Sequence, residues 1–262
     1  MKAIITDLDR TLLRTDKTLS EYTISVLKAC RDAGILVMAA TARPELIMLE
    51  YHEQIHFDAS TVTNGARILL PDRVIEYSIP RESGRAILAK ICEQPDVVIS
   101  METSDGLYAN VDIPEWTPVI YDGFPKLPTD GDLYKILVSS RHESIFRAVE
   151  EALTEDTYCT VAGKSLIQIM SRQATKWNGI KTMLDAMGVP IEEAVFFGDD
   201  YDDIEAIRMC GIGAAVSNAI PDVLAVADVV VGSNDEDGVA RFVRRHILHE
   251  IMACDFYQYR VE

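Results

Sequence analysis

The sequence is poor in basic residues. Its 262 residues include 25 lysines and arginines against 42 aspartates and glutamates, which gives a formal net charge of −17. So negative a chain repels the phosphate backbone of nucleic acids and the surface of anionic membranes. We therefore expect neither a nucleic acid polymer nor a membrane among its partners. A phosphorylated ligand would need a local excess of positive charge, from a bound cation or from a few basic side chains.

Cysteines are few and far apart, and long apolar segments are absent. No CxxC pair occurs, so neither a disulfide framework nor a cysteine zinc site is indicated. No apolar run approaches the ~20 residues that span a membrane. The acidic Asp7 comes too early for a signal peptide. We expect a soluble, cytoplasmic protein, and the sequence does not indicate its oligomeric state.

Strand-like and helix-like segments alternate at both ends of the chain. Continuous apolar runs predict buried strands, at 2–6, 35–40, 194–197, 212–216 and 228–231. Apolar residues at helical spacing, with capping residues beside them, predict helices, at 20–33, 44–56, 178–187, 203–209 and 236–248. This alternation predicts an α/β fold class, a Rossmann-like parallel sheet with helices on both faces.

The middle of the chain has a different pattern. Strand-like runs come in adjacent pairs, such as 158–162 and 165–170 around a hairpin turn at Gly163-Lys164. Two helices are expected there, at 82–93 and 143–153. These features predict an α+β insert. The predicted domains are a catalytic core, at 1–80 and 172–262, and an inserted α/β cap at 81–171 that determines substrate specificity.

Two aspartates, Asp7 and Asp9, stand at the carboxyl end of the first predicted strand. Carboxylates at i and i+2 leave a strand end toward the same side and crowd one small region. Such crowding is unfavourable unless a cation shares the charges or one group is protonated. Phosphoryl transfer uses both states, since one carboxylate attacks phosphorus and its neighbour gives a proton to the leaving oxygen. Taken alone, the pair is equally consistent with an N-capping loop.

A second acidic cluster follows the strand predicted at 194–197. Its four carboxylates occupy five consecutive positions, as Asp199, Asp200, Asp202 and Asp203. Mg²⁺ prefers hard oxygen ligands of this kind. An EF-hand is excluded, because the internal glycine and the distal glutamate of that loop are missing. The alternative is a solvated acidic turn, which the first aspartate pair makes the weaker interpretation.

Four stretches carry a family pattern in order. They are Asp7-Leu8-Asp9-Arg10-Thr11-Leu12-Leu13, Ala40-Thr41-Ala42-Arg43-Pro44, Lys176 ahead of a helix, and Gly198-Asp199 with Asp203. Together they resemble the haloacid dehalogenase superfamily, in particular its Cof-type phosphatases, and the insert resembles the larger cap of that family. Thr63-Asn64-Gly65-Ala66 and Ser217-Asn218-Ala219 resemble secondary motifs. The resemblance implies a Mg²⁺-dependent phosphatase that hydrolyses a small phosphorylated metabolite, a sugar phosphate or a cofactor phosphate, through an aspartyl-phosphate intermediate.

The resemblance also implies roles for the matched acidic residues. Asp7 would be the nucleophile, and Asp9 would act first as general acid and then as general base. Mg²⁺ would bind Asp7, Asp199 and the main-chain carbonyl of Asp9. Asp203 would be a further metal ligand or would hold a metal-bound water.

By the same resemblance, the phosphoryl group would be bound by the hydroxyl of Thr41, the amide of Ala42 and the ammonium of Lys176. Arg43 and Asn64 are further candidates for binding phosphate or substrate. These roles agree with the physical demands of phosphoryl transfer, whose transition state needs positioning and charge neutralisation. Without this context, Lys176 would be read as an ordinary surface lysine.

Three residues depart from the family pattern. Arg10 stands where the subfamily usually has glycine, so the local backbone differs or an extra cation lies near the site. Ala42 replaces the glycine after Thr41, which limits close approach of the backbone to phosphate. Asp202 replaces an asparagine and adds negative charge beside the metal.

Rival interpretations remain open at this point. His52-Glu53-Gln54-Ile55-His56 matches the HExxH pattern of zinc metalloproteases, with Glu76 as a loose candidate for a third ligand. That pattern is short, and a solvated helix end is the preferred interpretation. A phosphomutase or phosphotransferase on the same fold is the nearest alternative enzyme. A non-catalytic binding protein is the third alternative, which the presence of both Asp7 and Asp9 disfavours.

Overall fold

The computed structural model describes residues 1–114, 116–162 and 165–248. The chain divides into two compact units, one formed by Met1–Ile75 with the chain from Thr175 onward, the other by Glu76–Ala174. These borders lie a few residues from those expected for the core and the cap. The roles assigned to the two units remain predictions. None of the described helices combines the length and apolarity needed to span a bilayer.

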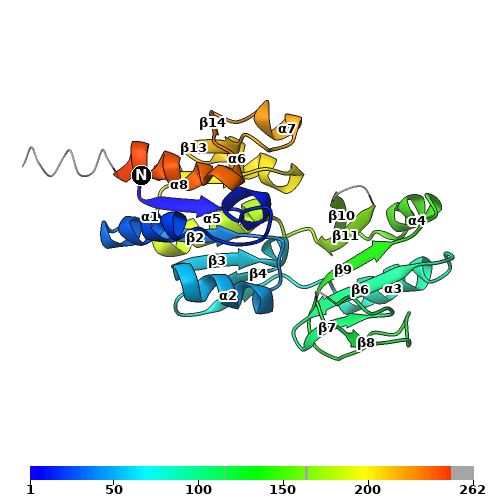
Figure 1. Cartoon of the computed structure of the whole chain (residues 1–262). Coiled ribbons are helices and arrows are strands. Elements are labelled where there is room, and N and C mark those ends of the chain that lie inside the picture. The colour runs from blue at the N-terminus through cyan, green and yellow to red at the C-terminus, as the bar shows by residue number, and fades with distance from the viewer. Residues whose placement is uncertain (115, 163–164, 249–262) are drawn as a thin grey trace, which may run out of the picture. The chain divides into compact units, whose positions relative to one another are not determined.

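The first unit is built on an eight-stranded sheet of order β14-β13-β12-β1-β2-β3-β4-β5 (Figure 1). Its strands are β1 (Ala3–Thr6), β2 (Leu36–Ala40), β3 (Ala59–Val62), β4 (Arg67–Leu69), β5 (Val74–Glu76), β12 (Ala194–Gly198), β13 (Ile212–Val216) and β14 (Val229–Val231). The six from β14 to β3 run parallel, and β4 is antiparallel to β3. The predicted α/β class with a parallel-sheet core is confirmed.

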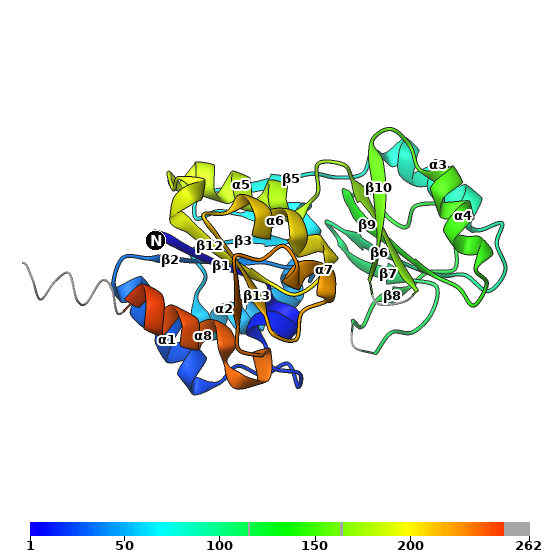
Figure 2. The same cartoon turned by 90° about the horizontal axis from the view of Figure 1, so that it is seen from above.

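Helices cover both faces of this sheet. Figure 2 shows α1, α2 and α8 on one side of the sheet and α5 and α6 on the other. Their bounds are α1 (Glu21–Asp32), α2 (Glu45–Ile55), α5 (Lys176–Met187), α6 (Ile204–Met209), α7 (Pro221–Leu224) and α8 (Gly238–Phe242), which continues as a wider helical turn at Val243–Leu248. Local sequence explains the ends of two of them. Ser20 caps α1 through its side chain, Thr175 does the same for α5, and Gly188 ends α5 in a left-handed conformation.

The sequence did not predict β3, β4 or β5. The reason is clear at β3, where Ser60 and Thr61 interrupt the apolar run although both side chains are buried. The strands β4 and β5 have three residues each. Such short strands at a sheet edge carry no periodic signal, so only their pairing in the sheet, β4 with β3 and β5 with β4, reveals them.

The second unit is a six-stranded sheet of order β10-β11-β9-β6-β7-β8 with two helices. Its elements are α3 (Arg81–Ile91), β6 (Val98–Thr103), β7 (Gly106–Ala109), β8 (Val119–Ile120), β9 (Leu133–Ser139), α4 (Ser144–Ala152), β10 (Thr157–Ala162) and β11 (Leu166–Ser171). All pairs are antiparallel except β7 with β8. The core joins Ile87 and Val149 of the helices to Ile136 and Ile167 of the sheet. The turn predicted at Gly163-Lys164 lies outside the described residues.

Candidate active site

Three parallel strands bring the predicted site residues to one edge of the first sheet. β1 lies between β2 and β12 and runs parallel to both, so the carboxyl ends of the three strands lie at the same edge. Asp7 follows β1, Thr41 follows β2 and Asp199 follows β12. The pairing continues past the strand ends, because Asp7 N–H donates to Phe197 O at 2.9 Å and Thr41 N–H donates to Thr61 O at 2.9 Å.

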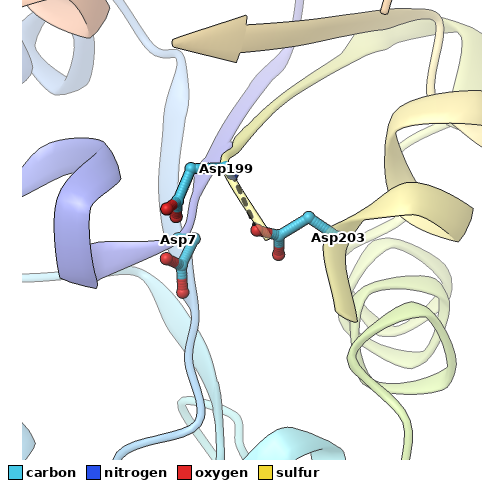
Figure 3. Close-up of side chains that lie close together, drawn as sticks. All are labelled: Asp7, Asp199 and Asp203. Carbon is cyan, nitrogen blue, oxygen red and sulfur yellow. Dashed lines mark hydrogen bonds between the residues drawn. The ribbon is translucent and has the colours of Figure 1, made fainter. Parts of the chain in front are cut away.

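Three buried carboxylates meet at this edge. Asp7, Asp199 and Asp203 each offer an oxygen, and these oxygens lie within 4.8 Å of one another. Figure 3 shows their side chains converging from the ends of β1 and β12 and from the turn that follows β12. Among the described residues, no other group of three histidine, cysteine, aspartate or glutamate side chains is so placed. A cluster of hard oxygen donors fits a divalent cation such as Mg²⁺.

The backbone of the second acidic motif positions Asp203. Its Oδ2 accepts the N–H of Asp199 at 2.9 Å, the dashed bond in Figure 3, and the N–H of Asp200 at 3.1 Å. This contact depends on Gly198, because a Cβ there would lie 2.5 Å from the Cβ of Asp203. The motif therefore holds one carboxylate rigidly at the site while Asp199 points into it.

Lys176 supplies the buried positive charge of the cluster. Its Nζ donates to Asp7 Oδ1 at 2.9 Å and to Asp203 Oδ1 at 2.8 Å, and its side chain is 5% exposed. Burial opposes the charged form of this ammonium. The attraction of Asp203 and Asp7 outweighs burial and raises the pKa of Lys176 well above its ordinary value. Lys176 is therefore a permanent cation at neutral pH.

One ammonium does not balance three carboxylates. Burial, and then repulsion by Asp203 and Asp199, raise the pKa of Asp7 well above its ordinary value despite Lys176. Burial and Asp203 likewise raise the pKa of Asp199 to about 6, although Thr11 Oγ1 donates to Asp199 Oδ1 at 2.9 Å. Both shifts have the same cause, a local excess of negative charge away from water. A further cation, or a proton on one carboxyl group, would offset this excess of negative charge.

Asp9 is held quite differently. Arg43 donates through Nε to Oδ2 at 2.6 Å and through Nη2 to Oδ1 at 2.7 Å, and Lys17 Nζ lies 2.5 Å from Oδ1. Burial raises the pKa of Asp9. The hydrogen bonds and charges of Arg43 and Lys17 outweigh burial and lower that pKa to about 2. In this arrangement Asp9 is an anion across the physiological range, and Arg43 is engaged with it.

The remaining candidates for binding phosphate lie around the end of β2. Thr41 is buried, and its Oγ1 accepts the N–H of Arg43 at 3.2 Å. Ala42 lies between them in a bend. Asn64 has a left-handed backbone with φ of 55°, and its amide donates to the carboxylate of Asp202. Within the part of the chain that the structure describes, the buried Oδ1 of Asn64 has no hydrogen-bond partner. Asn64 thus contacts Asp202, a pairing that the sequence analysis did not anticipate.

Arg10 adopts the backbone conformation that favours glycine. Its φ is 61° and its ψ is 5°, which explains the usual glycine at this position. The main-chain oxygen of Arg10 accepts from Asn218 Nδ2 at 2.8 Å. Its Nε lies 4.0 Å from Asp199 Oδ2, and its side chain is 60% exposed. The backbone therefore keeps the conformation that suits glycine, and of the two expectations the second holds, because an exposed cation lies at the rim of the cluster.

Comparison with known proteins agrees with this geometry. The family described as haloacid dehalogenase-like hydrolase matches residues 4–243. The chain belongs to this family. It is 30% identical to the 5-amino-6-(5-phospho-D-ribitylamino)uracil phosphatase YitU of Bacillus subtilis, over 93% of this chain and 96% of that protein.

Solved structures share the fold of this haloacid dehalogenase-like hydrolase. A haloacid dehalogenase-like hydrolase from B. subtilis superposes with a TM-score of 0.84 at 22% identity, over 94% of this chain and all of that chain. A sugar phosphatase of subclass IIB superposes with a TM-score of 0.77 at 23% identity, over 93% and 98% of the two chains. The family and its phosphatase relatives confirm the predicted enzyme class, a phosphoric monoester hydrolase.

The HExxH segment of this hydrolase gains no support as a zinc site. The helix α2 ends at Ile55, and His56 has a left-handed backbone with φ of 59°. The rings of His52 and His56 lie 5.0 Å apart. Within the described ranges, neither histidine belongs to a group of three ligand atoms lying within 4.8 Å of one another, and the same holds for Glu76.

The sequence does not predict that Lys17 and Tyr51 belong to the site. Lys17 contacts Asp9, eight positions earlier, from a polar loop that matches no motif. The Tyr51 hydroxyl donates to the main-chain oxygen of Lys17 at 3.2 Å. Tyr51 lies on the same helix as the HExxH segment, where its apolar spacing predicts only burial. No signal in a single sequence marks either residue.

Proposed function

We propose that this hydrolase is a Mg²⁺-dependent phosphatase that transfers the phosphoryl group of a small phosphomonoester to Asp7 and then to water. The observation that carries the proposal is the charge imbalance at the cluster. Asp7, Asp199 and Asp203 are buried together against the ammonium of Lys176. Buried like charges are costly unless a cation shares them. An excess of buried negative charge beside a carboxylate that can act as nucleophile suits a metal-assisted attack on a phosphate.

The carboxylates of Asp7, Asp199 and Asp203 fit Mg²⁺ in ligand chemistry, and the main-chain carbonyl of Asp9 is the fourth candidate ligand. When bound, Mg²⁺ would screen the repulsion between the phosphate and Asp7 and neutralise charge in the transition state. Lys176 adds a compact positive charge beside the attacking oxygen of Asp7. The Thr41 hydroxyl and the Ala42 amide would hold the phosphoryl oxygens.

Asp7 and Asp9 carry out the two steps of the proposed reaction. An oxygen of Asp7 attacks phosphorus as the bond to the leaving oxygen breaks, and Asp9 gives that oxygen a proton. In the second step Asp9 takes a proton from water, the water oxygen attacks phosphorus, and the bond to Asp7 breaks to release inorganic phosphate. Before the first step Asp9 must lose its contact with Arg43, which holds it as an anion, and must take up a proton from solvent. A substrate phosphate offers the Arg43 guanidinium the alternative anionic partner that this release requires.

The proposed substrate is a sugar phosphate or a cofactor phosphate. The name of YitU states that it acts on a phosphorylated ribitylamino-uracil, and one structural neighbour is a sugar phosphatase. We propose that the unit Glu76–Ala174 is the cap expected at 81–171 and that it determines which phosphomonoester the enzyme accepts. The reaction takes place in the cytoplasm, on small molecules.

The test is phosphate release from a panel of small phosphomonoesters, with and without Mg²⁺. Release that requires Mg²⁺, disappears with EDTA and falls by on the order of 10⁴-fold in Asp7→Asn supports the proposal. Asp185→Asn, a matched change at an exposed carboxylate of α5, should release phosphate at the wild-type rate. Mass spectrometry of acid-quenched wild type should find one phosphoryl adduct on Asp7.

Two outcomes would overturn it. Full activity in Asp7→Asn would remove the nucleophile from the mechanism. Transfer to a second sugar hydroxyl without release of inorganic phosphate, seen by ³¹P NMR, would establish a mutase instead.

A further inference from the structure

Lys17 provides a second cationic contact to Asp9, beside that of Arg43. Asp9 Oδ2 accepts one hydrogen bond, from Arg43 Nε, whereas Oδ1 accepts two, from Arg43 Nη2 and from Lys17 Nζ. The Lys17 side chain is 52% exposed. Exposed ion pairs usually contribute little to stability. The ion pair between Lys17 and Asp9 is therefore better explained by a role in the site than by stability.

Hydrogen bonds within the loop that carries Lys17 fix the backbone conformation of this residue. Lys17 N–H donates to Arg14 O at 2.8 Å, and Arg14 N–H donates to Thr18 O at 3.0 Å. Asp16 Oδ1 accepts both the N–H and the hydroxyl of Thr18. Within this closed turn Lys17 has a left-handed φ of 69°. A non-glycine residue adopts that conformation only where its surroundings enforce it, and such residues cluster at functional sites.

A single aromatic side chain supports both cations that contact Asp9. Tyr51 is 4% exposed, and its hydroxyl donates to Lys17 O at 3.2 Å. The Arg43 guanidinium carbon lies 5.2 Å from the centre of the same ring. Tyr51 therefore links the loop of Lys17 to the side chain of Arg43. These contacts form one connected set around Asp9, and neither Lys17 nor Tyr51 belongs to the matched motifs.

We propose that Lys17 is a positioning residue for Asp9, with Tyr51 as its support. The proposal rests on the function proposed above, in which Arg43 turns to the substrate phosphate. Lys17 then remains as the donor that holds Oδ1. Oδ2, which Lys17 does not contact, is the oxygen that faces the leaving group and transfers the proton. Without Lys17 the carboxyl group would rotate freely about its χ angles, and proton transfer depends on such alignment.

The experiment compares two substrates in Lys17→Met. One is the best alkyl phosphate of the panel, whose poor leaving group needs a proton, and the other is 2,4-dinitrophenyl phosphate, whose leaving group does not. We expect kcat/KM, which reports the steps up to phosphoryl transfer to Asp7, to fall by about tenfold to a hundredfold for the alkyl ester and to change by less than about threefold for the aryl ester. Lys17→Arg should recover most of the alkyl activity. Tyr51→Phe should show the same selectivity with a smaller loss.

Two controls separate this effect from charge and from folding. Lys28→Met removes one exposed cation from α1 of the same unit and should change neither rate. In an Asp9→Asn background, Lys17→Met should cause no further loss. Equal losses with both esters, or an undiminished loss in the Asp9→Asn background, would overturn the proposal. Failure of the proposed function is distinguishable, because Asp7→Asn would then retain phosphate release whatever Lys17 does.

Discussion

The guanidinium of Arg43 binds both carboxylate oxygens of Asp9, through Nε at 2.6 Å and through Nη2 at 2.7 Å. A planar fork of this kind matches the geometry of a carboxylate and of a phosphate equally well. The general acid of the proposed reaction and a proposed phosphate ligand are therefore paired with each other before substrate arrives. Binding of a phosphate would exchange one anionic partner of Arg43 for another and release Asp9 for proton transfer.

Replacing Arg43 should raise the pKa of Asp9. Arg43→Met removes two of the hydrogen bonds that hold this pKa at about 2, while burial, which raises it, remains. We expect the pKa to rise by at least about 1. Carboxyl ¹³C NMR titration measures it directly.

The lowered pKa of Asp9 should also make the free energy of unfolding depend on pH. The folded pKa of Asp9, about 2, lies below its ordinary value of 3.8, so the ion pairs contribute stability that is fully present above pH 3.8 and is lost as pH falls through about 2. Acid unfolding of Arg43→Met should show a smaller loss over this window than the wild type. An identical pH dependence in the two proteins would contradict the pairing.

Removing the buried ammonium should destabilise the fold. Lys176→Met leaves Asp7 and Asp203 facing each other without the Nζ that lies within 2.9 Å of both. Breaking a buried pair on one side costs about 3–5 kcal/mol, and we expect a loss in this range in urea unfolding without metal. Lys181→Met, at an exposed position of the same helix, should change the free energy of unfolding by less than about 0.5 kcal/mol. Similar values for the two variants would show that the ammonium does not balance the cluster.

Mg²⁺ should stabilise the protein more at neutral than at acidic pH. The pKa of Asp199 is raised to about 6, so without metal the stability contributed by this group falls as pH rises from 3.8 through about 6. Mg²⁺ binds the ionised carboxylates, and its effect should therefore grow as pH rises through the same window. At about 100 times the Kd we expect Tm to rise by roughly 5–10 °C at about pH 7.5.

Differential scanning fluorimetry with and without Mg²⁺ checks this dependence. The rise in Tm should be lost in Asp199→Asn and kept in Asp185→Asn, which changes an exposed carboxylate. A rise that is equal at about pH 5 and at about pH 7.5 would argue against binding at the ionised cluster.

The backbone at Arg10 should discriminate between side chains. With φ of 61° and ψ of 5°, this position suits glycine and disfavours a β-branched residue. We expect Arg10→Gly to lie within about 1 kcal/mol of the wild type and Arg10→Val to lose about 1–2 kcal/mol. Urea unfolding of both variants gives the difference. A valine variant as stable as the glycine variant would mean that another backbone conformation is readily adopted.

Much of this protein follows from its sequence. Continuous apolar runs and helical spacing place β1, β2, β12, α1 and α2 within a residue or two of their observed bounds. The reason is that buried parallel strands and amphipathic helices have local periodicity. The acidic motifs after β1 and β12 also predict the cluster of Asp7, Asp199 and Asp203, because parallel strands end at one edge of a sheet.

Other features depend on contacts between residues far apart in the chain. The sequence contains no sign that Asn64 pairs with Asp202, 138 positions away, or that Tyr51 reaches the loop of Lys17, 34 positions away. The engagement of Arg43 with Asp9 is of the same kind, since a motif identifies a residue type but not the partner its side chain selects. Sequence alone determined the fold class, the enzyme family and which motifs are candidates for catalysis. Tertiary structure decided which charges meet, because burial and distance set their pKa values and their partners.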